Sequence, residues 1–300
     1  MKLILRVSLL LALAGLSAAA RSAAPSANVP EVVYAVGDIA DCRTNAHRDV
    51  ATLIAADRAK LPADTSSHLL LLGDQVYPNG TAAEFADCFD PAWGRFKPDT
   101  LAVPGNHDYR TAAGAPFYAY FGAPAAPLGY YAQTLGNWLI LGLNSNIDMG
   151  PDSAQARWMS EQLAANTRQC VIAMWHHPRY SSGAHGNNAE ADALWRTAQR
   201  GRVSLVLAGH DHHYERFVPL DASGAASDRG IRSFVVGTGG AGLYPVNPSR
   251  PAISAARISQ RHGVLRLTLG EGSYQWQFIG LPNAEVLDAG EGQCLAPAKP

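Results

Sequence analysis

The sequence lacks an excess of charge of either sign. Its 300 residues include 24 Lys and Arg against 25 Asp and Glu, and charged residues make up only 16% of the chain. A protein that binds nucleic acid or an anionic membrane electrostatically needs a basic surface, so this composition argues against both partners. Gly numbers 28 and Pro 19, too few for a low-complexity chain, while 47% hydrophobic residues suffice for a large core.

The sequence also lacks an apolar run as long as a transmembrane helix needs, about 20 residues. Residues 3–16 are apolar apart from Arg6 and Ser8, and small residues follow at 17–20. Together with the basic Lys2, this pattern is typical of a secretory signal peptide. We therefore expect a signal peptide over residues 1–20, cleaved between about 20 and 27, and a secreted or periplasmic protein without a membrane anchor.

Cysteine is scarce, and all four cysteines lie beyond this N-terminal segment. Their spacing matches no zinc-site pattern, and an even number in an exported protein indicates disulfides. Three pairings are open, as is the alternative of four free buried thiols. We favour Cys42–Cys88, whose members both follow predicted strands, and Cys170–Cys294, which would tie the C-terminal tail to a strand.

Short apolar runs bounded by turn residues alternate with helix-like segments along the chain. Nothing repeats internally and no linker divides the chain, so we expect one α/β domain over residues 28–300. Two late runs alternate large apolar with polar residues, as antiparallel strands do. The expected strands are 32–36, 69–72, 101–103, 138–143, 171–175, 203–208, 234–236, 264–269 and 274–279, and the expected helices are 46–60, 82–89, 153–166 and 188–200.

Polar side chains follow five of the expected strands at their carboxyl ends, where open α/β sheets bind ligands. Singly, each has an ordinary explanation, because Gly-Asp is often only a turn and a lone His is often a hydrogen-bonded core residue. However, seven of the ten histidines lie at 107, 176–185 and 210–213, each after an expected strand, and only His47, His68 and His262, which we expect to be structural, fall outside. The segments are GDIAD (37–41), GDQVY (73–77), PGNHD (104–108), WHHP (175–178) and GHDHHY (209–214).

Carboxylate, amide, phenol and imidazole donors, without a thiolate, suit iron, manganese or zinc. About seven such side chains are too many for one catalytic ion, which needs open coordination positions. Two ions that share one carboxylate would account for the number. Pairs of this kind clamp the attacking and leaving oxygens of a displacement at phosphorus.

The motifs GD, GDxxY, GNHD, H and GHDHHYER together resemble the calcineurin-like metallophosphoesterase superfamily and, within it, the purple acid phosphatase branch. The similarity spans about residues 32–217. It implies a four-layer α-β-β-α sandwich of two mixed β-sheets flanked by helices, with a dinuclear metal site at the carboxyl-terminal edge of the strands. We expect a short, single-domain, exported bacterial-type form, without the large N-terminal β-domain of the plant enzymes.

The resemblance also implies the metal ligands. Ala40 stands where phosphodiesterase-like relatives carry a histidine ligand, and Tyr77 supplies a phenolate, a hard donor that matches a ferric ion. The first metal, Fe(III), would be held by Asp38, Asp74, Tyr77 and His212. The second, a divalent iron, zinc or manganese ion, would be held by Asp74, Asn106, His176 and His210, with Asp74 bridging the pair.

Further residues of these motifs are expected to act around the metals. The resemblance suggests His107 as a contact to substrate, and His185 as a second contact or an ordinary loop residue; either could bind phosphoryl oxygens or protonate the leaving group. Arg216 is expected to be an ion-pair partner rather than a phosphate clamp. Asp108 and Asp211 are expected to orient neighbouring imidazoles, and His177 and His213 to lie behind the ligands or at the surface.

We therefore predict an acid-phosphatase-like phosphomonoesterase, in which a metal-activated hydroxide attacks phosphorus in line. A phosphodiesterase or nucleotide hydrolase on the same metals is one alternative, and a non-catalytic exported module that binds metal or phosphate is another. The expected partner is a small-molecule phosphate ester, and the oligomeric state stays open. Specificity is expected from loops at 109–131, 181–188 and 239–254, where no pattern names the alcohol group.

Overall fold

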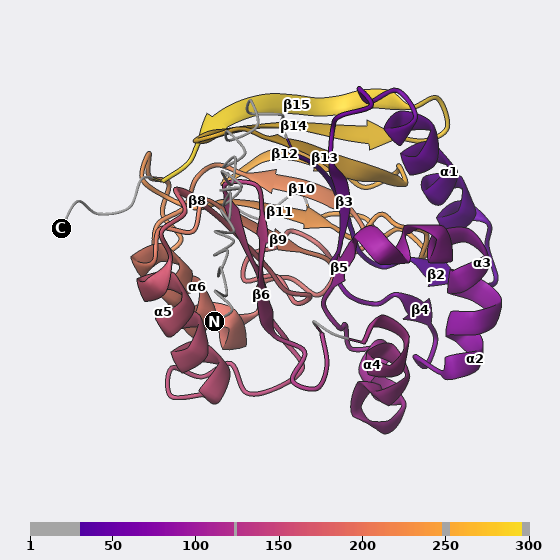
Figure 1. The fold of residues 1–300 in the computed structure, drawn as a ribbon, viewed down its shortest axis with the longest axis horizontal. Helices are drawn as coiled ribbons and strands as arrows, with labels where there is room; N and C mark the ends of the chain where they lie inside the picture. Colours follow the sequence, from indigo (N-terminus) through magenta and orange to yellow (C-terminus); the bar gives the residue numbers. More distant parts are fainter. Residues whose placement is uncertain (1–30, 123–124, 248–252, 296–300) are drawn as a thin grey trace, which may run out of the picture.

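The computed structural model describes residues 31–122, 125–247 and 253–295 (Figure 1). Two mixed β-sheets lie face to face, with helices on the outer side of each, which confirms the expected four-layer sandwich. The expected signal peptide and its cleavage zone lie outside the described residues. Within the described residues, every helix is too short or too polar to cross a membrane.

The first sheet has six strands in the order β15-β14-β13-β1-β3-β5. Three parallel strands from the start of the chain are extended by three antiparallel strands from its end. The register pairs Val36 with Leu71, and Leu71 with Ala102, so the three parallel strands end level with one another. The strands are β1 (Glu31–Val36), β3 (Ser67–Leu71), β5 (Thr100–Ala102), β13 (Gly263–Leu269), β14 (Ser273–Gly280) and β15 (Glu285–Gln293).

The second sheet has seven strands in the order β12-β10-β11-β9-β8-β7-β6. Its four central strands, β7, β8, β9 and β11, are parallel. The strands are β6 (Tyr131–Leu135), β7 (Trp138–Gly142), β8 (Cys170–Met174), β9 (Leu205–Ala208), β10 (Tyr214–Phe217), β11 (Arg232–Val236) and β12 (Ser254–Ile258). A two-stranded parallel ribbon, β2 (Ala40–Asp41) and β4 (Val76–Tyr77), lies beyond the ends of β1 and β3.

The central strands of the second sheet are buried on both faces. Ile140 and Ile172 belong to the core between the two sheets, whereas Leu139, Leu141 and Val171 belong to the core under the outer helices. Successive side chains of a strand point to opposite faces, so burial of both faces requires an unbroken apolar run. This is why the sequence predicts these strands well.

Helices cover the outer faces. The first sheet carries α1, whose Val50 and Ile54 are fully buried, and the second carries α5 and α6 (Figure 1). Ser153 caps α5, since its Oγ accepts a hydrogen bond from the Ala156 amide at 3.1 Å. The helices are α1 (Ala46–Arg58), α2 (Ala82–Glu84), α3 (Asp90–Trp93), α4 (Ala115–Phe121), α5 (Ala154–Ala165) and α6 (Asp192–Arg200), with a π-helical turn at Phe85–Phe89 and 3₁₀ turns at Gly94–Asp99, Asp108–Arg110, Ala112–Gly114 and Ala189–Ala191.

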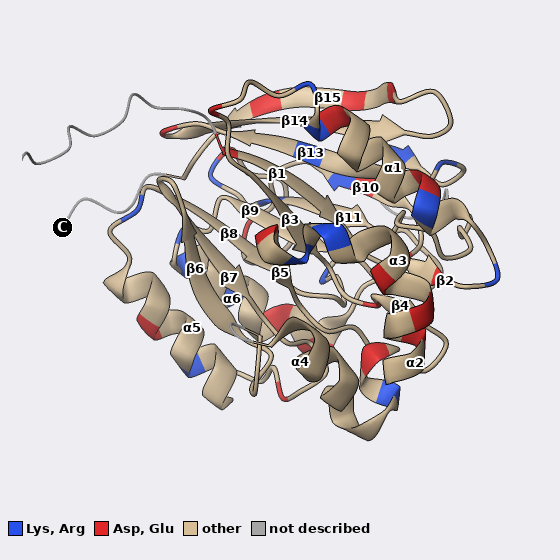
Figure 2. Cartoon of the chain, turned by 45° about the vertical axis from the view of Figure 1, so that its right-hand side comes forward, with Lys and Arg blue, Asp and Glu red and all other residues tan. Residues whose placement is uncertain are grey.

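Several elements were not expected from the sequence. Helix α4 lies inside the expected loop 109–131, and β6, β10, β12 and β15 were not predicted. Strand β15 forms the edge of its sheet and is largely polar, with acidic residues along its length (Figure 2). An exposed edge strand needs no apolar run, so its sequence does not differ from that of a loop.

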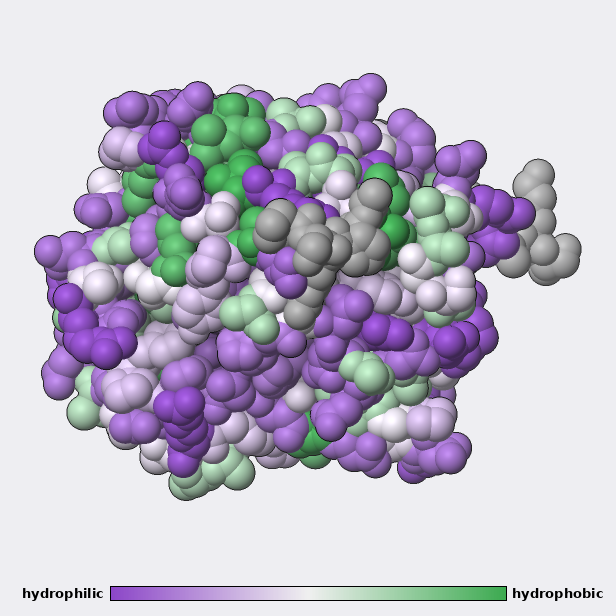
Figure 3. Space-filling view, turned by 180° about the vertical axis from the view of Figure 1, so that it is seen from behind, coloured by the Kyte–Doolittle hydropathy of each residue, from purple (hydrophilic) through white to green (hydrophobic). Residues whose placement is uncertain are grey.

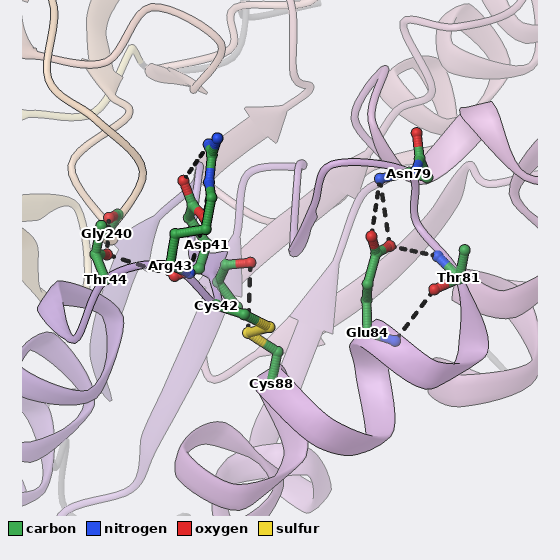
Figure 4. The surroundings of a disulfide bond; sticks show 10 residues. Asp41, Cys42, Arg43, Thr44, Asn79, Thr81, Glu84, Cys88 and Gly240 are labelled. Carbon is green, nitrogen blue, oxygen red and sulfur yellow. Dashed lines mark hydrogen bonds and ion pairs between the residues drawn. A yellow bond between two sulfur atoms is a disulfide. The ribbon is translucent and has the colours of Figure 1, made fainter.

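Both favoured disulfides are present. Cys42 is bonded to Cys88 and Cys170 to Cys294. The first bond joins the segment after β2 to the π-helical turn, beside the Asp41–Arg43 ion pair and the Thr81–Glu84 capping box at the start of α2 (Figure 4). The surface seen from behind is largely hydrophilic, and apolar residues gather there only in small clusters (Figure 3).

Candidate metal centre

The seven expected ligands come from both sheets. Asp38 follows β1, Asp74 follows β3, and Asn106 follows β5, so the first sheet delivers three of them at one edge. The second sheet delivers the others that face them: His176 follows β8 and His210 follows β9. Of the last two, Tyr77 lies within the short strand β4, and His212 lies just before β10.

Four of these residues form what we call the oxygen-rich half: Asp38, Asp74, Tyr77 and His212. The Tyr77 hydroxyl lies 3.0 Å from Asp38 Oδ1, 3.1 Å from Asp74 Oδ2 and 3.1 Å from His212 Nε2. A phenol has one proton, so it satisfies only one of these three acceptors. The atoms around the hydroxyl therefore converge with too few protons to satisfy them all. This is the arrangement expected around a bound cation.

The ring nitrogens of two expected histidine ligands are set by backbone carbonyls. His212 Nδ1 lies 2.6 Å from the Gly242 carbonyl oxygen, and His176 Nδ1 lies 2.8 Å from that of Leu72. A carbonyl oxygen only accepts, so each Nδ1 must carry the proton, and Nε2 of the neutral ring keeps its lone pair. Histidines that bind metals are usually oriented by such a partner, so both residues fit the ligand role.

The three remaining ligands, together with two neighbouring histidines that are not expected ligands, form what we call the nitrogen-rich half: Asn106, His176 and His210, with His177 and His185. His176 Nε2 lies 3.1 Å from Asn106 Oδ1 and 3.4 Å from Asp74 Oδ2. Ring nitrogens of His176, His177 and His210 lie within 4.8 Å of one another, close enough to surround one ion. The shared Asp74 joins the two halves.

The pKa values follow from burial and the crowded charges. Burial and the neighbouring Asp38 and Asp74 carboxylates hold the pKa of the Tyr77 phenol well above its ordinary value. Burial opposes the charged form of His176, but the Asp74 carboxylate outweighs it and raises the pKa to about 9. Burial and the nearby imidazoles lower the pKa of His210. A bound cation would favour the phenolate and the neutral imidazoles. The crowded side chains that oppose ionisation of Tyr77 in the absence of metal would therefore favour metal binding.

The backbone at three expected ligands is left-handed. Asp38 has φ 60°, Asp74 has φ 52° and His210 has φ 72°, a region that side chains other than glycine rarely adopt. The Asp38 carboxylate accepts a hydrogen bond from the His210 amide at 2.8 Å, which links the two sheets at the centre. Such left-handed conformations cost free energy and persist only where the surrounding structure enforces them. They are common at functional sites.

The loop after β3 requires glycine at position 73, because it approaches the His176 ring closely. A Cβ at Gly73, whose φ is +94°, would lie 2.4 Å from His176 Nδ1. The β3 loop can therefore reach the His176 ring only without a side chain at this position.

Among the described residues, the hydrogen bonds of Asp108 and Asp211 go to backbone amides and a hydroxyl rather than to the imidazoles that these residues were expected to orient. The Asp108 carboxylate accepts hydrogen bonds from the Gln75 amide at 3.1 Å and the Gly105 amide at 2.8 Å. Asp211 accepts from the His185 amide at 2.9 Å and the Gly186 amide at 3.2 Å, and from the Ser181 hydroxyl. Both carboxylates thus hold the backbone of loops that carry site residues.

The expected catalytic histidines, the partly exposed His107 and the exposed His185, lie beside the expected ligands. The His107 ring packs 4.3 Å from the Tyr77 ring, and its Nδ1 donates to the Pro78 carbonyl at 2.7 Å. The exposed His185 ring lies 4.2 Å from the His210 ring. His213 is fully buried instead and pairs with Glu215 at 3.0 Å, so it stands apart from the ligands.

Residues expected outside the chemistry behave as structural residues. Arg216 is an ion-pair partner, 2.7 Å from Asp288. His47 is buried, His68 lies 3.6 Å from Glu31, and the His262 ring donates to the Thr238 carbonyl.

Two residues of the site, Tyr244 and Ser145, were not predicted by name. Tyr244 stacks on His212 with ring centroids 4.1 Å apart, and Ser145 lies 2.7 Å from His177 Nδ1. Tyr244 lies in the 239–254 loop, which was expected to contribute to specificity without any residue of it being named. Residues 248–252 of this loop lie outside the described residues. Ser145 follows β7, and nothing in its sequence context marks it.

A sequence profile of the family described as calcineurin-like phosphoesterase matches residues 31–214, a segment that contains all seven expected ligands. The chain belongs to this family. Several of its curated relatives are purple acid phosphatases, and this calcineurin-like phosphoesterase belongs to the purple acid phosphatase-like branch.

Two of these relatives define the extent of the similarity. Purple acid phosphatase 23 of Arabidopsis thaliana is 31% identical over 146 residues, which cover 42% of this chain and 32% of that protein. Phosphoenolpyruvate phosphatase of Allium cepa is 28% identical over 212 residues, which cover 62% of this chain and 42% of that protein. The chain thus spans less than half the length of these relatives.

Two solved structures share the fold. The purple acid phosphatase PPD1 of yellow lupin (Lupinus luteus) superposes with a TM-score of 0.77 at 18% identity, covering 89% of this chain and 54% of that one. GAP50, described as the anchor in the inner membrane complex of Plasmodium, superposes with a TM-score of 0.69 at 14% identity, covering 90% of each chain. One fold therefore occurs both in a protein named as a phosphatase and in one named as an anchor.

Proposed function

We propose that this protein is a dinuclear-metal phosphate ester hydrolase that acts on phosphomonoesters. The observation that carries the proposal is the convergence of Asp38, Asp74 and His212 on the Tyr77 hydroxyl at 3.0–3.1 Å. We assign the first metal, Fe(III), to Asp38, Asp74, Tyr77 and His212. We assign a divalent metal to Asp74, Asn106, His176 and His210. Two such cations would activate a water molecule and neutralise charge that develops at phosphorus.

The chain itself would position and protonate the substrate. With Nδ1 committed to the Pro78 carbonyl, His107 has Nε2 free to accept a proton when neutral and to donate one when charged. The exposed His185 ring lies beside the expected ligand His210, where it would meet a phosphoryl oxygen of the substrate. One of the two would supply the proton that the departing alkoxide needs.

The onion relative supports a monoester as substrate, since phosphoenolpyruvate, from which it is named, is a phosphomonoester. A phosphodiesterase on the same metals would prefer a bis-ester. Turnover of the mono- and bis-esters of one chromogenic alcohol separates the two, and we expect the monoester to be hydrolysed faster.

A non-catalytic role deserves its own test, because GAP50 shares the fold and is described as an anchor. Metal analysis and the visible spectrum of the purified protein provide it. We expect two metals per chain, a tyrosinate–iron absorption band, and hydrolysis at acid pH. A protein that binds two metals but hydrolyses neither ester between pH 4 and 9 would refute the enzymatic proposal. A colourless, active protein would refute only the ferric assignment.

We also propose that the protein is exported. The disulfides Cys42–Cys88 and Cys170–Cys294 support this, because such bonds persist in oxidising compartments. N-terminal sequencing of the native protein would test the cleavage expected between residues 20 and 27.

A further inference from the structure

His177 lies in the nitrogen-rich half although it is not among the expected ligands. Its ring is 4.4 Å from the His210 ring and 4.9 Å from the His176 ring, measured between centroids. It is partly exposed, whereas His176 beside it is fully buried. His177 therefore faces the same place as two expected ligands and remains accessible to a molecule that enters from solvent.

The hydrogen bonds of Ser145 favour one tautomer of this ring. The Ser145 Oγ accepts a hydrogen bond from the His177 backbone amide at 3.0 Å and lies 2.7 Å from His177 Nδ1. The hydroxyl has one proton to donate, and Nδ1 is its one acceptor among the described residues. Donation to Nδ1 satisfies both groups, and it leaves the proton of the neutral ring on Nε2.

This arrangement is opposite to that of the expected ligands. Nδ1 of His176 and of His212 meets a carbonyl oxygen and must donate, which leaves an Nε2 lone pair for a metal. Nδ1 of His177 meets a hydroxyl that can donate, which leaves an Nε2–H group. A ring with Nε2–H cannot bind a metal through that nitrogen, but it can donate a hydrogen bond to an anion.

We propose that His177 is a substrate-binding residue whose Nε2–H donates a hydrogen bond to a phosphoryl oxygen of the bound ester, and of inorganic phosphate as product. The inference rests on the proposed function for its substrate. Ser145 is the positioning residue that sets the tautomer. The nitrogen-rich half then contains a fixed donor for the phosphoryl group in addition to its metal ligands.

The test is the affinity of the metal-loaded full chain for inorganic phosphate, measured by calorimetry, together with the metal content of each variant. We expect His177→Ala to keep two metals per chain and to bind phosphate roughly tenfold to a hundredfold more weakly, the range for a hydrogen bond to a charged group. His177→Gln, whose amide can place a donor near the Nε2 position, should recover part of the loss. Ser145→Ala should weaken binding by less than His177→Ala, because the ring stays but its tautomer is no longer fixed.

His68→Ala is the matched control, since His68 lies at the start of β3, at the end of the strand away from the centre. It should match the original protein in both measurements. Loss of metal from His177→Ala would show that the residue is a ligand and overturn the proposal. Unchanged phosphate affinity, or absence of phosphate binding by the loaded original protein, would overturn it as well. If phosphate binding responds to His177 while neither ester is hydrolysed, the proposed function fails and this assignment stands.

Discussion

The two halves of the metal centre differ in how far they are closed to solvent. Asp38, Asp74, Tyr77 and His212 are all at most 7% exposed, and their donor atoms lie in mutual contact. In the nitrogen-rich half, His177 and His210 are partly exposed and His185 is exposed. The closed half suits a permanently held, hard cation, and the open half suits the exchange of substrate and product.

The difference also has an electrostatic side. In the oxygen-rich half, burial and two carboxylates raise the pKa of the Tyr77 phenol, and the carboxylates leave that half short of positive charge. In the nitrogen-rich half, burial and neighbouring imidazoles lower the pKa of His210 and bring that of His177 to about 3, so these two rings stay neutral, whereas the Asp74 carboxylate outweighs burial and raises the pKa of His176 to about 9. A cation is therefore needed most in the first half, and neutral donors are available in the second.

Asp74→Asn is expected to have the largest effect, because Asp74 is common to both halves. Loss of the bridging charge should lower kcat at least about a thousandfold and remove metal from both positions. Turnover of a chromogenic monoester and metal analysis measure the two effects. Asp64→Asn, at an exposed position, is the control. Normal turnover and metal content in Asp74→Asn would show that the halves are independent.

Tyr77→Phe should affect the oxygen-rich half alone. The ring can still pack against His107, but the hydroxyl that contacts three donors is lost. We expect loss of any tyrosinate–iron absorption band and a kcat about tenfold to a hundredfold lower. Tyr244→Phe, which alters another phenol beside His212, should keep the band. A band that persisted in Tyr77→Phe would assign the colour to another group.

Asp211→Asn should affect the open half, because its carboxylate holds the amides of His185 and Gly186. The loop approaches so closely that a Cβ at Gly183 would lie 2.2 Å from the Asp211 carboxyl carbon. An amide side chain accepts less well than a carboxylate, so kcat/KM should fall roughly tenfold with metal content unchanged. His185→Ala should cost a similar amount.

The double variant of Asp211 and His185 separates a direct from an indirect effect. If Asp211 acts by holding His185, the double variant should be little worse than either single one. Additive losses would mean that Asp211 acts on something else, and metal loss in Asp211→Asn would mean that it supports the neighbouring ligands.

Glu215→Gln should have the smallest effect on catalysis and act on stability. Glu215 is fully buried and accepts hydrogen bonds from Ser182, Ser254 and His213. Burial alone would raise its pKa, but these bonds outweigh burial and lower it to about 2. Because the folded-state pKa lies below the ordinary value of 4.5, the carboxylate stabilises the fold above about pH 4.5, and this contribution is lost as the pH falls toward 2.

Denaturant unfolding across this pH range measures the contribution, which is roughly 2–4 kcal/mol at neutral pH. Glu215→Gln should lose it and show a flatter acid dependence between pH 4.5 and 2, with kcat near the original value. An unchanged acid dependence would contradict the assignment to Glu215.

The sequence predicts the four central strands of the second sheet, and polar residues that gather at strand ends, because both depend on local signals. Strands buried on two faces, such as β7 and β8, appear as unbroken apolar runs, and polar residues after strand ends must meet at one edge of a sheet. The exposed edge strand β15 has no such signal. Helix α4 begins within a segment rich in Gly, Ala and Pro, which is typical of a loop.

The hydrogen-bond partners around the expected ligands could not be predicted from the sequence, for physical reasons. The partners of Asp108 and Asp211 are backbone amides, which every residue has, so a sequence motif does not reveal them. The pair Ser145–His177 is separated by 32 positions and meets only because β7 and β8 are neighbours. The left-handed backbone at Asp38 and His210 is imposed by the tertiary structure.

The place of β1 in the first sheet has a consequence for biosynthesis. β1 pairs with β3 on one side and with β13 on the other, and Glu31 is opposite Leu269. A growing chain therefore carries all seven expected ligands, the last of them His212, well before β13 has emerged to complete the first sheet. Such long-range pairing folds slowly and leaves strand edges open. A chain cut short before β13 would therefore leave the edge of β1 free to pair with another molecule.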